Sequence, residues 1–217
     1  MLPQPSPVVR RRPGIFCLEG DWTDRLTSAL SVRPLLEMLV PQGISTVPIH
    51  RDVATSEELF YYLEKWLQPG YERYTVGYLA FHGEESCIGL GNEEITLDGL
   101  ADFLGERARG RILYFGSCGT LAAPDEVLRD FVVRTGVKAI CGYTKEVDWL
   151  YSAAFDFILL PLLLRRRYLR TVYRTLAEEH VGFVDGLGFR LVTKDFMSPR
   201  ELATAARDSA GPAASLR

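Results

Sequence analysis

Two apolar runs that each end in a reactive side chain decide the fold: TVGYLAFHG at residues 75–83 and RILYFGSCG at residues 111–119. Each run is short, apolar and bounded by glycine or charged residues, which is typical of a fully buried strand. A helical pattern at residues 97–104 lies between them. A strand, a helix and a second strand in this order predict a parallel βαβ unit.

The same alternation extends to both sides of this unit. Apolar runs predict five buried strands, at Gly14–Leu18, Ser45–Ile49, Thr75–Phe81, Arg111–Phe115 and Val137–Cys141. Helical periodicity predicts helices at Leu26–Leu39, Ser56–Leu67, Leu97–Leu104 and Pro124–Thr135, with Ser56 as an N-cap. The pattern therefore predicts an α/β fold, a three-layer sandwich with a mostly parallel central sheet flanked by helices.

Two further segments depart from simple alternation. Directly after His82, Cys87–Leu90 and Glu94–Leu97 predict a small hairpin around Gly91-Asn92. The longest apolar stretch, Phe157–Leu164, is too short to span a bilayer. We expect this stretch to form a buried core helix, and a helix that binds a membrane surface or a partner is the alternative.

Length and composition predict one globular domain. With 217 residues, 47% of them hydrophobic, the chain is long enough to bury a sizeable core. Residues 1–13 and 208–217 have the composition of a flexible lead and tail, so the domain is predicted to span 14–207. The net charge of −3 and the pI of about 5.7 favour neither nucleic acid nor an anionic membrane as a partner.

The cysteines and the first residues indicate a cytoplasmic protein. No two of the four cysteines form a CxxC pair, so the sequence indicates no zinc site, and it indicates no cofactor. Four unpaired thiols fit a reducing compartment better than a disulfide framework does. The opening MLPQPSPVVRRRP lacks the apolar core of a secretory signal.

His82 and Cys118 are the candidate catalytic residues. Ligands of open α/β sheets bind beyond the carboxyl ends of the strands. Two neighbouring parallel strands lie about 4.8 Å apart, so side chains that follow them are expected to face each other. A histidine can take the proton of a thiol and later protonate a leaving amine. The amides of Gly83 and Cys118 are the candidate oxyanion-hole donors, and Gly116 and Gly119 permit a tight turn around the nucleophile.

These motifs resemble the caspase-like (clan CD) cysteine proteases, and most closely the CHAT domains, which are related to separase. In that family one strand ends in His-Gly, a hairpin and a helix follow, and the next strand ends in a small-residue turn that holds the nucleophilic cysteine. The matching segments are FHG at 81–83, IGLGNEEITLDGLADFL at 88–104, YFGSCGT at 114–120 and AICGYTKEVDWLYSAAFDF at 139–157. The resemblance covers roughly residues 14–192.

The resemblance also leaves departures. Many family members carry Asp two residues before the catalytic cysteine, where this chain has Gly116. The segment GFRLV at 188–192 is only loosely similar to the last family strand. We identify no third catalytic residue from the sequence.

The family resemblance implies that an acidic turn reads the residue before the scissile bond (P1). Asp148 matches that turn best, Glu146 is the alternative register, and Asp21 could line the same pocket, as in metacaspase-like enzymes. Carboxylates in this position select Arg or Lys. Trp22, Tyr143 and Trp149 either wall the cleft or pack in the core.

The predicted function is that of a cysteine endopeptidase that cleaves a protein substrate after a basic residue. Stand-alone CHAT-like proteases of prokaryotes imply a role in antiviral defence or cell death, with an activating partner protein or a homodimer as further partners. The first alternative is a catalytically silent caspase-like module for interaction or regulation. A flavodoxin-like regulatory or nucleotide-binding domain is disfavoured, because no GxGxxG or GxxxxGK[ST] motif follows the first strand.

Overall fold

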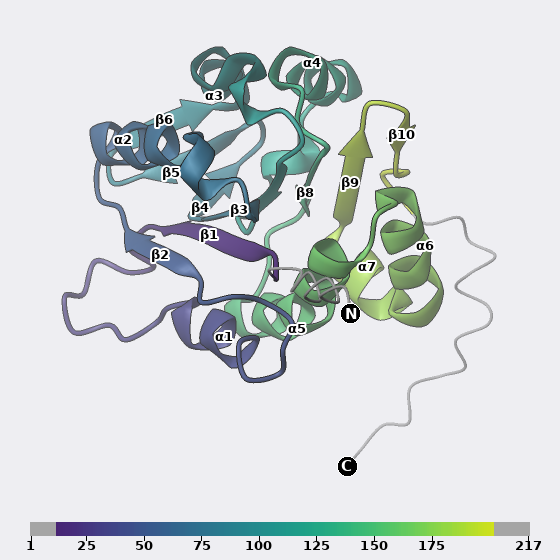
Figure 1. The fold of residues 1–217 in the computed structure, drawn as a ribbon, viewed down its shortest axis with the longest axis horizontal. Helices are drawn as coiled ribbons and strands as arrows, with labels where there is room; N and C mark the ends of the chain where they lie inside the picture. Colours follow the sequence, from purple (N-terminus) through teal and green to yellow (C-terminus); the bar gives the residue numbers. More distant parts are fainter. Residues whose placement is uncertain (1–11, 202–217) are drawn as a thin grey trace, which may run out of the picture.

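Seven strands form the central sheet of the computed structural model, which describes residues 12–201 (Figure 1). Residues 1–11 of the predicted lead and the whole predicted tail, residues 208–217, lie outside the described residues. The strands are β1 (Gly14–Glu19), β2 (Ile49–Asp52), β3 (Tyr74–Ala80), β7 (Ile112–Phe115), β8 (Ala139–Tyr143), β9 (Phe189–Thr193) and β10 (Phe196–Met197), and their order is β10-β9-β8-β7-β3-β1-β2. The five strands from β8 to β2 are parallel, and β9 and β10 add antiparallel pairs at one side.

Helices cover both faces of this sheet, so the predicted three-layer sandwich is confirmed (Figure 1). One layer holds α2 (Ser56–Trp66), α3 (Leu97–Leu104) and α4 (Asp125–Thr135), and the other holds α1 (Arg33–Met38), α5 (Trp149–Arg165), α6 (Leu169–Glu179) and α7 (Val181–Leu187). Short 3-10 turns lie at Pro69–Tyr71, Gly105–Ala108 and Thr120–Ala122.

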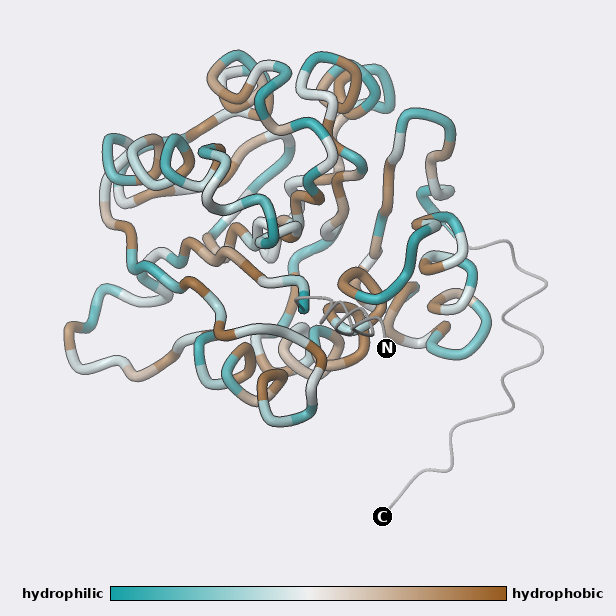
Figure 2. The backbone as a smooth tube through the Cα atoms, in the orientation of Figure 1, coloured by the Kyte–Doolittle hydropathy of each residue, from teal (hydrophilic) through white to brown (hydrophobic). Residues whose placement is uncertain are grey.

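Consecutive strand residues enter two different hydrophobic cores. On β3, Val76 and Tyr78 face the core under α5, whereas Leu79 packs in the core under α2, α3 and α4. A strand that is buried on both faces has a continuous apolar run instead of alternation, which explains the runs in the sequence. Figure 2 shows this hydrophobic interior between helices whose outer turns are hydrophilic.

Helix α5 contains the long apolar stretch and is a core helix, as expected. Its residues Phe155, Leu159 and Leu163 are buried against the sheet. Among residues 12–201, no helix combines the length and the apolar character that crossing a bilayer requires.

Two predicted elements near the N-terminus were misplaced. The strand predicted at Ser45–Ile49 begins only at Ile49, because Pro48 has no N–H to donate to a ladder. The helix predicted at Leu26–Leu39 covers only Arg33–Met38, and residues 20–32 form a loop instead. The buried carboxylate of Glu19 accepts a hydrogen bond from the amide of Val32, which holds the chain outside a helix until that point.

Two smaller details also differ. The N-cap of α2 is Thr55, whose hydroxyl accepts a hydrogen bond from the amide of Glu58 at 3.3 Å, and not Ser56. The predicted hairpin is confirmed as β5 (Cys87–Leu90) and β6 (Glu93–Thr96), one residue away from the expected end. A third strand, β4 (His82–Glu84), joins it, so His82 begins a small antiparallel sheet.

Candidate functional site

His82 and Cys118 lie together beyond the carboxyl ends of β3 and β7, which pair in parallel with Leu79 opposite Phe115. His82 starts β4 two residues after β3 ends, and Cys118 lies in the turn after β7. Both side chains line one cleft, together with Gly83, Gly119 and Glu146. The fold therefore brings the two predicted catalytic residues to the same edge of the sheet.

The turn that carries Cys118 is held by contacts on both sides. The amide of Gly116 donates to Leu79 O at 2.9 Å, and the amide of Gly119 donates to Lys145 O at 3.0 Å. Thr120 hydrogen bonds to Ser117 Oγ at 2.7 Å and donates to Cys87 O at 2.8 Å. Gly119 has φ +65°, a left-handed conformation that glycine adopts without strain.

Cys118 is the cysteine that solvent reaches. It is partly exposed, whereas Cys17, Cys87 and Cys141 are buried. Burial raises the pKa of the Cys17 and Cys141 thiols well above the ordinary value, so both stay protonated and inert. The Sγ atom of Cys118 accepts a hydrogen bond from the amide of Val147 at 3.4 Å. A donor aimed at sulfur is complementary to the negative charge of a thiolate.

Gly83 allows the turn that carries Cys118 to pack directly on the His-Gly segment. A Cβ atom at this position would lie 2.8 Å from the carbonyl oxygen of Cys118 and 2.5 Å from Thr120 Oγ1. We expect Gly83→Ala to lower the free energy of unfolding by about 1–3 kcal/mol, because the clash includes backbone that cannot rotate away. Urea denaturation measures this change.

Gly182→Ala is the matched control for this prediction. A Cβ atom at Gly182 meets nothing within 4 Å, and the residue lies inside α7, where alanine is the better helix former. The control is expected to be neutral or stabilising. Equal stability of Gly83→Ala and the wild type would contradict the close packing of the turn.

A cavity of about 240 Å³ opens beside the pair and contains a buried carboxyl group. Its lining includes His82, Cys118 and Asp156, and Asp156 is only 1% exposed. The Asp156 carboxylate accepts hydrogen bonds from Tyr78 Oη at 2.6 Å and Tyr114 Oη at 2.5 Å. Burial raises the pKa of Asp156 to about 7, against the opposing effect of the two tyrosine donors.

Of the three acids predicted to read P1, the structure brings only Glu146 beside the pair. Glu146 lines both the cleft and the cavity that contain Cys118. Asp148 lines neither of them and caps α5, where its carboxylate accepts the amide of Tyr151 at 2.8 Å. Asp21 lines a neighbouring groove that includes His82 but not Cys118. The sequence interpretation missed Asp156.

Aromatic residues complete the cavity. Trp22 and Trp149 line it, as one of the two readings of the sequence expected. Tyr143 is instead fully buried, and its hydroxyl hydrogen bonds to that of Tyr114. Gly116 takes the position at which many CHAT-type proteases have Asp. A Cβ atom there would lie 2.3 Å from the ring of Tyr78, so the glycine leaves room for this tyrosine.

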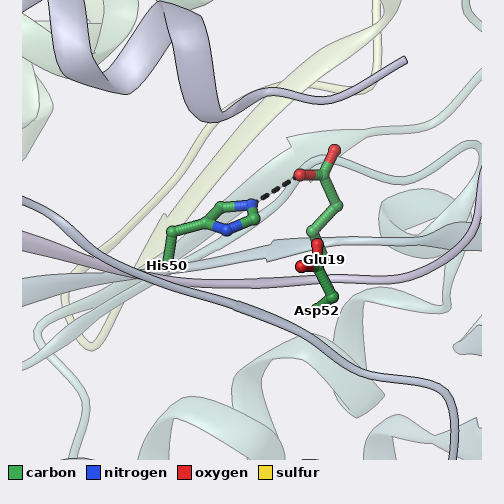
Figure 3. Close-up of side chains that lie close together, drawn as sticks. All are labelled: Glu19, His50 and Asp52. Atoms are coloured by element: carbon green, nitrogen blue, oxygen red, sulfur yellow. Dashed lines mark hydrogen bonds and ion pairs between the residues drawn. The ribbon is translucent and has the colours of Figure 1, made fainter. Parts of the chain in front are cut away.

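A second cluster, Glu19, His50 and Asp52, has the spacing of metal ligands (Figure 3). Its ligand atoms lie within 4.8 Å of one another, and His50 Nε2 is 2.6 Å from Glu19 Oε2. Both oxygens of Glu19 already accept hydrogen bonds: Oε2 from Ser31 and His50, and Oε1 from Trp22 and the amide of Val32. A metal ion would have to displace these donors, so the arrangement is that of a hydrogen-bond centre.

Comparison with known proteins assigns the chain to a family. Residues 13–193 match the model of the family described as "Family of unknown function (DUF6642)", and the chain belongs to that family. The matched residues include β1 to β9 and both His82 and Cys118. No curated protein matches the chain.

Proposed function

We propose that this member of the DUF6642 family is a caspase-like cysteine endopeptidase of the CHAT type that cleaves a protein substrate after Arg or Lys. The observation that carries the proposal is that His82 and Cys118 follow adjacent parallel strands and line one cleft, beside a cavity that contains the buried carboxyl of Asp156. A nucleophile, a base and a specificity group in one concave site are the elements that peptide hydrolysis requires.

In the proposed reaction His82 takes the proton from the Cys118 thiol. The sulfur then forms a bond to the scissile carbonyl carbon, and the electron pair of the C=O bond moves to oxygen. The C=O bond then re-forms from that electron pair as the C–N bond breaks, and His82 gives its proton to the leaving amine. Water, deprotonated by His82, hydrolyses the resulting thioester and releases the thiol.

The amides of Gly83 and Cys118 are the proposed oxyanion donors. Among residues 12–201, no hydrogen bond engages the amide of Cys118. The Gly83 segment packs directly against the same turn. Donors that are already held in place stabilise the negative charge that develops on the carbonyl oxygen without further reorganisation.

The P1 side chain is proposed to enter the cavity that Asp156 lines. An ionised carboxylate there would form a charge-assisted pair with a guanidinium or an ammonium group. Trp22 and Trp149 give the cavity an apolar wall for the aliphatic stem of Arg or Lys. Asp156 thereby replaces Asp148 and Asp21 as the proposed P1 reader, and Glu146 stays as a second acid at the site.

We further propose a cytoplasmic location, which the four free cysteines support. The resemblance to CHAT-like proteases makes a prokaryotic defence or cell-death circuit the proposed setting, with an activating partner protein or a second copy of the chain.

The test of the activity is covalent labelling by a peptidyl acyloxymethyl ketone with Arg at P1. We expect the wild type to be labelled and Cys118→Ala to be unlabelled, because the reagent needs an activated thiolate in a substrate site. Mass spectrometry of the intact protein and of its peptides measures the label. Cys87→Ala is the matched control, since Cys87 lines the same cleft but is buried, and it should retain the label.

A silent module would give a different pattern. Cys118 would then react with iodoacetamide but not with the peptidyl reagent, and no peptide of a library would be cleaved. That result would leave the fold intact and reject the peptidase.

A further inference from the structure

The His82 imidazole packs against an aromatic ring. Within the described part of the chain, no hydrogen bond engages this ring. Its ring contact is with Trp22, at 5.6 Å between centroids and an interplanar angle of 72°. This edge-to-face geometry is the one that aromatic rings prefer. Catalytic histidines are usually held in one orientation by a third group, so the packing of Trp22 is the candidate for that role.

Trp22 is itself fixed by Glu19. The indole N–H of Trp22 donates to Glu19 Oε1 at 2.5 Å. Glu19 is the last residue of β1, lies opposite Ala80 in the parallel ladder and is 3% exposed. The amide of Gly20 donates to Ala80 O at 2.9 Å, which ties the start of the loop to β3 two residues before His82.

The Glu19 carboxylate is fully occupied and therefore rigid. It accepts hydrogen bonds from Ser31 Oγ at 2.6 Å, the amide of Val32 at 2.8 Å and His50 Nε2 at 2.6 Å, in addition to Trp22 (Figure 3 draws the pair with His50). Burial alone would favour the neutral acid, but these donors outweigh it and hold the pKa of Glu19 below its ordinary value. Of these four partners, Trp22 is the one whose ring packs against His82.

We infer that Trp22 is the positioning residue for the catalytic imidazole and that Glu19 is the carboxylate that holds Trp22. The chain would then orient its histidine through an aromatic contact backed by a buried carboxylate, and not through a direct hydrogen bond. This inference rests on the proposed peptidase function.

The test is a double-mutant cycle on the reactivity of Cys118. The rate of its alkylation by iodoacetamide at pH 7 is measured in the wild type, Trp22→Phe, His82→Ala and the double variant. Trp22→Phe keeps a ring but removes the indole N–H, and we expect it to slow alkylation about 10-fold. In the His82→Ala background, Trp22→Phe should cause no further loss, because the residue acts through the imidazole.

Two controls separate positioning from general damage. Tyr61→Phe changes an exposed aromatic residue of α2 that lines neither the cleft nor the cavity, and it should leave the alkylation rate unchanged. Because phenylalanine still supplies an apolar wall to the cavity, Trp22→Phe should lower kcat in peptide cleavage with little change in KM, whereas loss of a substrate contact would raise KM. Glu19→Gln is tested in a second cycle of the same kind. It should slow the alkylation of Cys118 less than Trp22→Phe does, and this slowing should also be absent in the His82→Ala background.

The outcomes that overturn the inference are distinct from failure of the function. Equal slowing by Trp22→Phe with and without His82, or no slowing at all, would reject the positioning role and leave the peptidase standing. Unchanged alkylation and cleavage in His82→Ala would reject both.

Discussion

His82→Ala is expected to lower kcat/KM for peptide cleavage by about 10²–10⁴-fold while the domain stays folded. The loss is large because the proposed mechanism uses this imidazole three times: to deprotonate Cys118, to protonate the leaving amine and to deprotonate the water that hydrolyses the thioester. The fold should tolerate the change because His82 is exposed, and its ring packs only edge to face on Trp22. Steady-state kinetics and thermal unfolding of the same preparations measure the two effects.

The other two histidines supply the comparison. His180 joins α6 to α7 and lines neither the cleft nor the cavity that contains Cys118, so His180→Ala should keep full activity. His50→Ala should reduce stability, because it removes a donor from the buried carboxylate of Glu19. A greater loss of activity in His180→Ala than in His82→Ala would mean that the wrong histidine is assigned to the chemistry.

The sheet could be predicted from the sequence because of where it is buried. Strands β1, β3, β7 and β8 have apolar residues in both cores, so each is a continuous apolar run that stands out from its surroundings. Loop 20–32 could not be predicted, because its apolar spacing is compatible with a helix. What prevents the helix is a tertiary contact, the carboxylate of Glu19 bound to Ser31 and to the amide of Val32.

In the candidate site too, residues placed by the strands could be predicted, whereas a residue placed by tertiary contacts could not. His82 and Cys118 directly follow predicted strands, so a parallel sheet places them together without further information. Asp156 lies in the middle of α5, and its partners Tyr78 and Tyr114 come from β3 and β7. That network exists only after the helix packs on the sheet. One signal was present: Asp156 is the only charged residue between 149 and 164, and a charge within a buried apolar helix indicates a specific role.

For His50 the sequence contains no signal of its role. The sequence places His50 after a short apolar run, and this position alone predicts that it tolerates alanine. In the structure its side chain is 6% exposed and bonds to Glu19. Nothing in the local sequence indicates this pairing, because Glu19 and His50 are 31 residues apart in the chain and meet only when their two strands pair.

Asp156→Asn is expected to reduce kcat/KM for substrates with Arg at P1 by about 30- to 5,000-fold, which corresponds to about 2–5 kcal/mol. The substitution keeps the size of the side chain but leaves the guanidinium of the substrate without a counter-charge in a desolvated cavity. Alkylation of Cys118 by iodoacetamide should be unchanged, since that small neutral reagent does not use the cavity. Asp148→Asn is the matched control, because asparagine also caps a helix and Asp148 lies outside the cavity.

The pH dependence of cleavage after Arg is an independent test of the role of the Asp156 carboxyl group. Because burial raises its pKa to about 7, Asp156 is largely neutral at pH 6 and ionised at pH 8. Cleavage after Arg should therefore increase across this range, and the increase should be absent in Asp156→Asn.

The effect of the Asp156 carboxyl group on stability has the opposite dependence on pH. The folded protein holds this proton more tightly than the unfolded chain, so the contribution of Asp156 to stability is full below pH 4 and is lost as the pH rises through 7.

These two trends can be separated from general pH effects by comparing wild type and Asp156→Asn in the same buffers. Between pH 5 and pH 8, the free energy of unfolding of the wild type should fall relative to that of Asp156→Asn. Over the same range, the rate at which the wild type cleaves after Arg should rise relative to that of the variant. A library preference for Asp at P1 would overturn the assignment, because a carboxylate in the cavity repels a second one. Unchanged cleavage after Arg in Asp156→Asn, together with loss in Glu146→Gln, would move the specificity group from the buried helix to the exposed turn beside Cys118.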